Sequence, residues 1–249
     1  MIKKIVSGII VFLLIGCTSY DKIYRDSDIS KAMLSGKIIT EEGLPLEGVK
    51  IKLNDKQESR SDINGKFFFT YLFFGEYKLT FEKEGYSNEE YIFKYDMKNK
   101  KIPFIKAKLM SFNFLLNEGI YLLSQKKYSE VESVLERLKR IASDEESYLY
   151  LKSVYLCERK KYKDALDIVE SLINSDRKNL YYNLLLIDIY GNLGWFQKKA
   201  ELCLIIGKNN PDEYLYLIKQ AAEIYKEKLE DQENYNKLIE LYESMNSKK

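Results

Sequence analysis

The chain has 249 residues, a formal charge of +2 from 40 Lys and Arg against 38 Asp and Glu, three Cys and no His. Without histidine there is no His-containing zinc site, no His general base and no Ser/His or Cys/His nucleophile pair, which excludes most common hydrolase mechanisms. The nearly balanced charge gives no basic footprint for nucleic acid, and so few cysteines do not make a disulfide scaffold. We therefore expect no metal, no cofactor and no nucleic-acid partner.

The first residues have the pattern of an export signal. Lys3 and Lys4 precede an apolar run over residues 5–15, which is too short to span a bilayer. The run closes on Leu-Ile-Gly-Cys at residues 14–17. This tetrad resembles the lipobox of bacterial lipoproteins, which implies cleavage before Cys17 and acylation of that cysteine. The alternatives are an uncleaved anchor and a soluble secreted chain in which the cysteine occurs by chance.

The resemblance to a lipoprotein sets the first two segments. Residues 1–16 are predicted to be the signal peptide and residues 17–35 the acylated Cys17 with a polar tether, in which a short helix over residues 28–34 is an alternative. Several acyl chains anchor a protein stably in a membrane. Because Thr18 replaces the Asp of the enteric inner-membrane retention signal, we expect the outer membrane of a bacterial cell envelope, on its periplasmic or surface side. Cleavage also removes Lys3 and Lys4, so the side-chain charge of the mature chain sums to zero.

Residues 36–109 have the pattern of short strands separated by glycine turns. Val49, Ile51 and Leu53 alternate with polar residues and are predicted to share one face of a half-buried strand, and residues 77–81 repeat the pattern. Several strands at such short, turn-punctuated spacing predict an all-β sandwich.

A family resemblance covers the same region. The residues that carry it are Gly36, Ile38, Gly43, Pro45, Leu46, Gly48, Val49, Ile51, Ser61, Asp62, Gly65, Phe67, Phe69, Gly75, Tyr77, Leu79, Phe81, Lys83, Gly85 and Tyr86. In this order and spacing they resemble the carboxypeptidase regulatory-like domain. The resemblance implies a transthyretin-like seven-stranded β-sandwich that accompanies other domains. The zinc-bearing catalytic domain that it follows in the carboxypeptidases has no counterpart here, so no catalytic residue carries over.

Two features between residues 61 and 74 have both a functional and a structural interpretation. The segment 62–65 looks like the start of a calcium loop, but Phe73 stands where an EF-hand needs a bidentate acid, so we favour a tight turn. The aromatic residues are interpreted as core and strand packing rather than as a ligand platform, except that alternation leaves Phe68 without a place in the core. They are Phe67, Phe68, Phe69, Tyr71, Phe73 and Phe74.

From residue 111 the chain repeats itself every 34 residues. Tyr128, Tyr162 and Phe196 are related by this step, as are several aliphatic positions. A 34-residue period built from two amphipathic helices is the tetratricopeptide signature, and each unit buries its apolar face only against its neighbours. The fold class is therefore multidomain, with an N-terminal all-β sandwich and a C-terminal all-α solenoid that resembles tetratricopeptide repeats over residues 111–246.

The resemblance implies units near 112–145, 146–179 and 180–213, followed by a divergent cap over 214–246. Gly119, Ala165 and Pro211 stand at typical motif positions. Ser153 and Ile187 replace the glycine in the later units, Val131 and Lys199 replace the alanine, and Ala200 indicates a one-residue slip. In the last part we expect helices over 212–229 and 232–245, with Asp212 as an N-cap and Tyr235 39 residues after Phe196.

In tetratricopeptide arrays the concave groove is lined by the first helix of each pair. The resemblance places there Asn113, Leu116, Ile120, Leu123, Ser147, Tyr150, Val154, Cys157, Tyr181, Leu184, Asp188 and Gly191. Because the set is largely apolar, we expect it to accept an apolar or aromatic peptide or helix of a protein partner. The alternative is that so short an array packs this face against its own cap or the sandwich.

Cys157 and Cys203 fall in a first and a second helix of different repeats. We interpret them as buried free thiols, since cysteine is among the residues most often buried. A disulfide bridge in an oxidising periplasm is the alternative.

The function expected from these features is that of a membrane-anchored envelope lipoprotein, a non-catalytic scaffold that binds a protein through its repeats. One alternative is a surface-exposed adhesin or glycan-binding lipoprotein that uses the sandwich loops near Tyr71. Another is an enzyme with carboxylates alone, such as a glycosidase, which needs two acids facing one cleft. No acidic pair stands out in the sequence, and Asp188 is the one acid predicted on the groove face.

Overall fold

The computed structural model describes residues 32–96, 98 and 101–247. The predicted signal peptide, Cys17 and the tether up to residue 31 lie outside these residues, as does most of the alternative helix over 28–34. The chain divides into two compact units between Met110 and Ser111.

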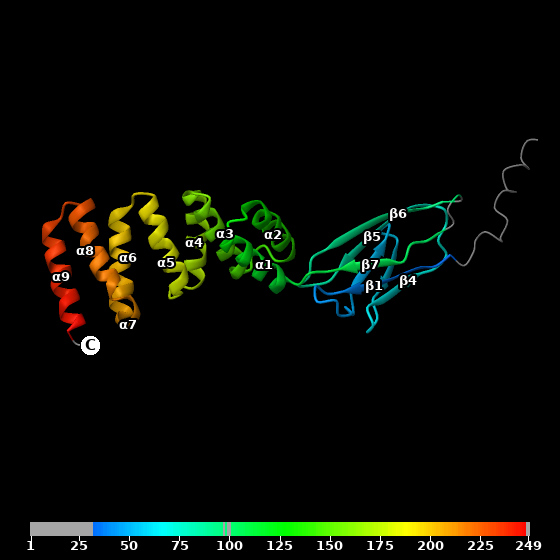
Figure 1. The fold of residues 1–249 in the computed structure, drawn as a ribbon, viewed down its shortest axis with the longest axis horizontal. Helices are drawn as coiled ribbons and strands as arrows, with labels where there is room; N and C mark the ends of the chain where they lie inside the picture. Colours follow the sequence, from blue (N-terminus) through cyan, green and yellow to red (C-terminus); the bar gives the residue numbers. More distant parts are fainter. Residues whose placement is uncertain (1–31, 97, 99–100, 248–249) are drawn as a thin grey trace, which may run out of the picture. The chain divides into compact units, whose positions relative to one another are not determined.

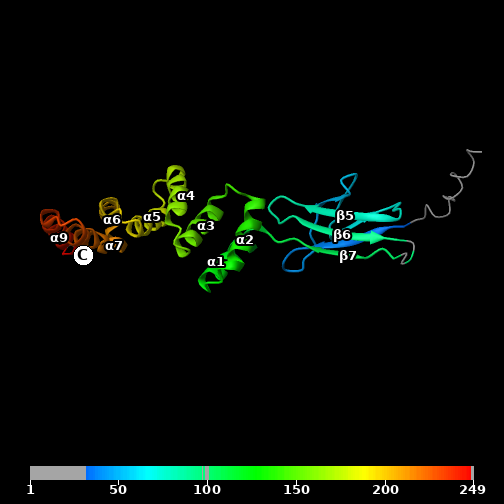
Figure 2. The same ribbon diagram turned by 90° about the horizontal axis from the view of Figure 1, so that it is seen from above.

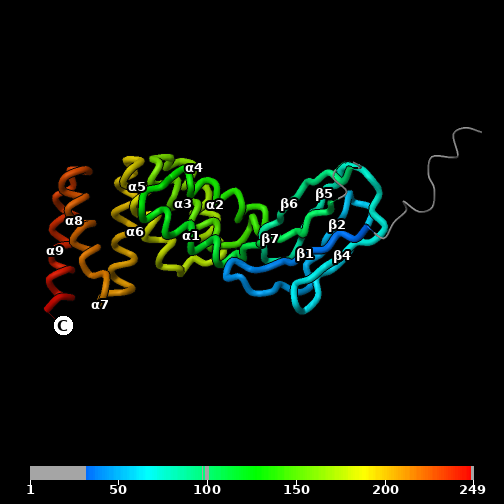
Figure 3. Tube along the Cα trace, turned by 45° about the vertical axis from the view of Figure 1, so that its right-hand side comes forward, coloured from blue at the N-terminus to red at the C-terminus, as the bar shows by residue number. Residues whose placement is uncertain are grey.

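The first unit is built from strands. Those that the described residues form are β1 (Leu34–Ile39), β2 (Lys50–Leu53), β3 (Gln57–Arg60), β4 (Lys66–Phe69), β5 (Gly75–Glu82), β6 (Glu89–Tyr95) and β7 (Ile105–Lys108). They make a sheet in the order β4-β1-β7 and a second sheet in the order β3-β2-β5-β6 (Figures 1 and 3). Neighbouring strands are antiparallel except β1 and β7, which pair in parallel.

Strand β1 starts earlier than the sequence suggested. It begins at Leu34, so the predicted tether to residue 35 is two residues too long, and Leu34 is in a strand rather than in the alternative helix. The reason is burial, because the Leu34 side chain is 0% exposed and lies opposite Phe69 of β4.

One apolar core lies between the two sheets. Ile38 and Ile105 reach it from the sheet with β1, and Ile51, Leu79 and Phe81 reach it from the other sheet, each at most 2% exposed. The faces predicted from the alternating pattern are therefore confirmed. The two sheets and their shared core establish a β unit, while its transthyretin-like family stays a prediction.

The turn before β4 is closed by Asp62. Its Oδ1 accepts hydrogen bonds from the backbone N–H groups of Asn64 and Lys66 at 2.9 and 2.7 Å. Gly65 has φ +71°, and a Cβ on it would lie 2.3 Å from the Ile38 carbonyl oxygen. The carboxylate thus holds the turn, which supports the structural interpretation of this segment.

The aromatic residues of 67–74 are divided between core and surface. Phe67 and Phe69 are buried, and Phe68 is 63% exposed, as alternation requires. The interpretation of Tyr71, Phe73 and Phe74 as core was wrong, because they are 66%, 55% and 40% exposed. Strand β4 ends at Phe69, and in the connection to β5 that follows only Leu72 is buried.

The second unit is all helical in its regular structure. Its helices are α1 (Phe112–Ser124), α2 (Tyr128–Ile141), α3 (Glu146–Glu158), α4 (Tyr162–Ser175), α5 (Leu180–Asn192), α6 (Phe196–Asn209), α7 (Pro211–Tyr214), α8 (Tyr216–Lys228) and α9 (Gln232–Asn246). Helices α1 to α6 follow one another as antiparallel pairs (Figure 2). None of the helices among the described residues is both long enough and apolar enough to cross a membrane.

The turn inside each pair repeats with the predicted period. Lys126, Lys160 and Gly194 are 34 residues apart and all have positive φ, +56°, +60° and +75°. Each donates its backbone N–H to the carbonyl three residues before it, on Leu123, Cys157 and Gly191. Because the same turn recurs with the same hydrogen bond, the period of 34 is a property of the backbone as well as of the sequence.

The small-residue positions explain how the pairs pack. A Cβ on Gly119 of α1 would lie 2.8 Å from Leu151 of α3 and 3.3 Å from Val134 of α2, so glycine lets three helices approach closely. In α6 the buried small residue is Ala200 rather than residue 199, although α6 still begins 34 residues after α4. The predicted slip therefore changes the facing of α6 and not its boundary.

The last helices depart from the repeat. Helix α9 begins at Gln232, 36 residues after the start of α6, so the predicted offset of 39 was too large. The prediction of Asp212 as N-cap was also wrong, because α7 begins at Pro211 after the N-cap Asn210 and places Asp212 in its first turn. Helix α8 then packs principally on α6 and α9, which makes this pair a divergent end of the array.

Candidate binding surface of the helical repeats

The candidate surface is formed by α1, α3 and α5, the first helices of the first three pairs. Helix α3 packs against both α1 and α5, so the residues predicted to line a groove come from neighbouring helices. None of these residues is buried. Ile120 and Tyr181 are 52% and 68% exposed. Asn113 and Asp188 are exposed as well, and the intermediate ones are Leu116, Leu123, Ser147, Tyr150, Val154, Cys157, Leu184 and Gly191.

This exposure decides one alternative within the helical unit. Large apolar side chains that were covered by the divergent end would be buried, as Leu217 and Ile218 of α8 are at 3% and 0% exposure. Helices α8 and α9 instead leave Ile120 and Tyr181 accessible. We name the surface formed by these α1, α3 and α5 residues the first-helix face.

Tyrosines from two repeats meet on this face. The rings of Tyr150 on α3 and Tyr182 on α5 lie 5.6 Å apart between centroids. Tyr182 is 7% exposed, and its hydroxyl donates a hydrogen bond to Glu146 Oε2 at 3.2 Å. Burial, followed by the neighbouring Tyr181 and Cys157, raises the pKa of Tyr150, which keeps its hydroxyl protonated. Sequence reasoning named Tyr150 and Tyr181 but missed Tyr182, which anchors Tyr150 from behind.

The thiol of Cys157 lies within the field of Asp188. Burial raises the pKa of Cys157 to about 11, and the negative charges of Asp188 and Glu158 add to the effect. Burial also raises the pKa of Cys203 on α6 to about 11, with Lys199 opposing and Asp188 adding to the shift. Both thiols are free, so the disulfide alternative is not what the structure contains. A protonated thiol is a poor nucleophile, which makes both cysteines structural.

Lys199 closes the far edge of the face. A Cβ on Gly191 would lie 2.8 Å from Lys199 Nζ and 3.1 Å from Lys199 Cδ, so this side chain lies across the glycine. Together with Asp188 it places one charge of each sign at the end of an otherwise apolar surface. This end is suited to orient a bound segment by its polar groups, while the apolar part supplies contact area.

Sequence reasoning missed a cleft of about 460 Å³ beside α5 and α6. Its walls are Leu180, Leu202 and Ile205, and Arg177 and Lys178 stand at its rim. The remaining lining residues are Asn183, Ile206, Asn209 and Asn210. Residues from the α4–α5 connection and from the end of α6 meet only through the helical packing, so no local motif could have indicated this cleft.

A second, more open cleft of about 390 Å³ lies at the turn between α5 and α6. It includes Trp195, which is 40% exposed and has Lys198 Nζ 4.6 Å from its ring centroid. The one tryptophan of the chain was a signal for this position. Neither cleft is lined by Asp or Glu, so neither supplies the two facing acids that a glycosidase needs. Nor do the described residues form a cluster of Cys, Asp and Glu able to hold a metal ion.

Comparison with known proteins gives structural neighbours but no family assignment. No protein-family model matches the chain. No curated protein sequence matches it either.

Several solved structures resemble part of the chain. MamA from Desulfovibrio magneticus RS-1 is 20% identical, with a TM-score of 0.45 over 54% of this chain and 77% of that chain. TTC0263, a TPR protein of Thermus thermophilus, is 16% identical, with a TM-score of 0.42 over 54% of this chain and 74% of that one. YrrB, described as a TPR protein with an unusual peptide-binding site, is 13% identical, with a TM-score of 0.45 over 54% and 68%. The repeat period and the helix pairs therefore rest on the geometry of this chain itself.

Proposed function

We propose that this protein is a membrane-anchored lipoprotein of the bacterial cell envelope and a non-catalytic scaffold that binds a protein partner on the first-helix face. The observation that supports the binding role is the accessibility of large apolar side chains on that face, above all Ile120 and Tyr181 at 52% and 68% exposure. Exposed apolar surface of this kind is a common mark of an interaction site. The anchoring rests on the lipobox-like residues 14–17 alone.

The partner segment is proposed to be an apolar or aromatic helix or extended peptide. The face combines Leu116, Leu123, Val154 and Leu184 with the tyrosines, so it offers apolar contact area and few charges. Aromatic anchors in partly enclosed positions contribute most of the affinity at protein interfaces. Tyr150 is held by Tyr182 and is thus ready for contact without a further loss of side-chain freedom.

The binding role is tested by removing single contact side chains. Affinity capture from membranes, with the mature chain compared with one lacking residues 111–249, identifies the partner. We expect Tyr181→Ala to weaken its binding by about tenfold or more, as for an aromatic hot spot. Tyr121→Ala and Tyr216→Ala are matched controls, because these tyrosines are 62% and 56% exposed but lie outside the first-helix face. Equal binding by Tyr150→Ala, Tyr181→Ala and the controls would remove this face from the interaction.

The anchor is tested separately. A radiolabelled fatty acid should be incorporated into the parent chain and not into a Cys17→Ser variant, and membrane fractionation should place the labelled protein in the outer membrane. Labelled material found only in the inner membrane would contradict that location, and labelling of the Cys17→Ser variant would contradict acylation at this cysteine.

One observation favours a second candidate function, glycan binding by the sandwich. Tyr71 is 66% exposed and has φ +60°, a conformation that is costly for a bulky residue. The Tyr77 hydroxyl fixes the adjacent backbone, since it accepts from the Phe73 N–H at 3.0 Å and donates to the Phe73 carbonyl at 2.8 Å. A rigid loop with exposed rings suits stacking on sugars. Glycan-array binding that Tyr71→Ala abolishes would support this role, and an array without binding would discard it.

The same unit is proposed to belong with the carboxypeptidase regulatory-like domains. The order of its glycine and aromatic positions and its two sheets around one core support that assignment. In this proposal the unit carries no chemistry and serves as a spacer or docking module for the repeats.

A further inference from the structure

Three lysines lie side by side across the outer face of the three-stranded sheet. Lys37 on β1 is directly opposite Lys66 on β4 and is also paired with Lys106 on β7. Neighbouring strands are about 4.8 Å apart, so the three side chains start within about 10 Å of one another. Like charges directly opposite each other destabilise a sheet. This row therefore has a cost in the free protein, which an anionic partner would offset.

No acid neutralises this row. Strands β1, β4 and β7 contain no Asp or Glu. Within the part of the chain that the structure describes, none of the three lysines forms an ion pair. Because the charge is unpaired and local, it attracts anions even though the mature chain has no net side-chain charge.

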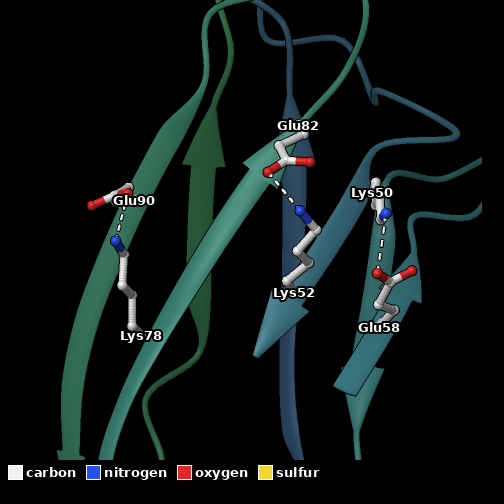
Figure 4. Close-up of polar contacts among 6 residues, drawn as sticks. All are labelled: Lys50, Lys52, Glu58, Lys78, Glu82 and Glu90. Carbon is white, nitrogen blue, oxygen red and sulfur yellow. Dashed lines mark hydrogen bonds and ion pairs between the residues drawn. The ribbon is translucent and has the colours of Figure 1, made fainter. Parts of the chain in front are cut away.

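The other sheet of the same unit is a built-in contrast. Its outer face pairs Lys50 with Glu58 at 3.0 Å, Lys52 with Glu82 at 3.0 Å and Lys78 with Glu90 at 2.7 Å (Figure 4). These pairs run diagonally between strands, so the face is covered by alternating charges that satisfy one another. The absence of such pairs on β1, β4 and β7 is thus a difference between the two sheets and not a general feature of the unit.

Phenylalanines stand beside the lysine row. Phe68 of β4 is 63% exposed and lies opposite Ser35 of β1. Phe104 immediately precedes β7 and is 66% exposed, and the parallel register continued by one residue places it on the other side of Ser35. Side by side, the two rows read Lys-Lys-Lys and Phe-Ser-Phe. Aromatic rings next to basic side chains are the composition of surfaces that lie at a lipid headgroup interface.

We propose that this lysine face, defined by Lys37, Lys66, Lys106, Phe68 and Phe104, docks onto the surface of an anionic lipid bilayer. The lysine ammonium groups contact headgroup phosphates, and the phenylalanine rings enter the boundary between headgroups and acyl chains. Lysine suits this position because its apolar stem lies along the sheet while its charged end reaches outward. Docking adds a second contact to the one that acylated Cys17 supplies.

The position of the predicted anchor favours a bilayer over a soluble anion. Cys17 precedes Ala32 by 15 residues, a stretch that reaches at most about 50 Å when fully extended. An acylated chain is thereby restricted to the vicinity of the membrane, where even weak contacts are favoured by a high effective concentration. This part of the argument rests on the proposed anchoring, but the test below uses a chain that cannot be acylated, so either proposal can fail without the other.

The test is vesicle co-sedimentation of the chain from residue 17 onward with the substitution Cys17→Ser. The vesicles are phosphatidylcholine alone or phosphatidylcholine with phosphatidylglycerol in a two-to-one ratio. We expect binding only to the vesicles with phosphatidylglycerol, and its loss at high salt. A variant with Lys37→Gln, Lys66→Gln and Lys106→Gln should lose about a hundredfold in partition coefficient, since each lysine near an anionic surface contributes about fivefold. Phe68→Ser with Phe104→Ser should cost about tenfold.

The matched control removes the same charge from the opposite sheet. Lys50→Gln, Lys52→Gln and Lys78→Gln change the net charge equally and should leave binding within about threefold of the parent. Equal losses in the two triple variants would overturn the proposal. So would phenylalanine substitutions without effect, together with equally tight binding to dextran sulfate, because the face would then fit a soluble polyanion. Thermal unfolding serves as the folding check, and Lys66→Gln with Lys106→Gln on the edge strands replaces the triple variant if Lys37→Gln misfolds.

Discussion

Lys160 and Gly194 occupy the same position in successive helical turns and share the left-handed backbone conformation, with φ +60° and +75°. A side chain at such a position clashes with the following carbonyl, at a cost of about 1 kcal/mol, and glycine avoids that cost. The repeat therefore uses two residue types in one backbone geometry, of which only one is relaxed.

A reciprocal pair of substitutions follows from this difference. Lys160→Gly should raise the free energy of unfolding of the chain by about 0.5–1 kcal/mol, and Gly194→Ala should lower it by about 1 kcal/mol. Urea unfolding of the helical signal measures both changes. Effects of the same sign at both positions would show that the turns are not equivalent.

Gly36 should be intolerant of any side chain. A Cβ on it would lie 2.4 Å from the Ile105 carbonyl oxygen of the paired strand and 2.5 Å from the Phe67 ring. Because a backbone atom cannot move aside cheaply, Gly36→Ala should destabilise the β unit by about 2–4 kcal/mol. Gly75→Ala is the control, since no atom lies within 4 Å of its added Cβ and its φ is not positive. Differential scanning calorimetry compares the two, and equal melting temperatures would refute the close approach of β1 and β7.

The thiols should react slowly at neutral pH. The pKa values of Cys157 and Cys203 are raised from 9.0 to about 11, so near pH 8 the thiolate population is about a hundredfold lower than in the unfolded chain. A raised pKa means that the folded state favours the protonated thiol. Its contribution to stability is therefore full below pH 9 and is lost as the pH rises through about 11.

Iodoacetamide labelling of the Cys17→Ser chain, followed by mass spectrometry, measures this reactivity in buffer and in urea. Labelling of folded Cys157 at the unfolded rate near pH 7 would contradict the raised pKa. Faster labelling above pH 9 in the folded state is the expected pH dependence.

The sequence predicted the strand faces because the signal is local. Alternation alone placed Ile51, Leu79 and Phe81 in the core and Phe68 outside it. It did not reveal that Lys37 is flanked by Lys66 and Lys106, because that row depends on the register between strands distant in sequence. Nor did it show that β4 ends at Phe69, so the exposed aromatic residues beyond it were misassigned to the core.

In the helical unit the period of 34 was readable, since it is a property of neighbouring residues, and it located the helices of the first three pairs. The contact partners were less so. Tyr182 supports Tyr150 from the next repeat, and α8 packs on α6 rather than continuing the pattern. Both depend on how one helix turns against another, which a one-residue change such as Ala200 for residue 199 is enough to alter.

The central claim is that the first-helix face holds a protein partner, and site-specific photo-crosslinking in intact membranes tests it most directly. A photoreactive phenylalanine analogue is placed in the full acylated chain at position 120 or 181 on the face, or at position 121 or 216 as equally exposed controls. We predict that positions 120 and 181 crosslink to one and the same protein, that Leu184→Ala weakens both adducts, and that the controls give none. Adducts of equal yield at all four positions, or none at 120 and 181, would contradict the account.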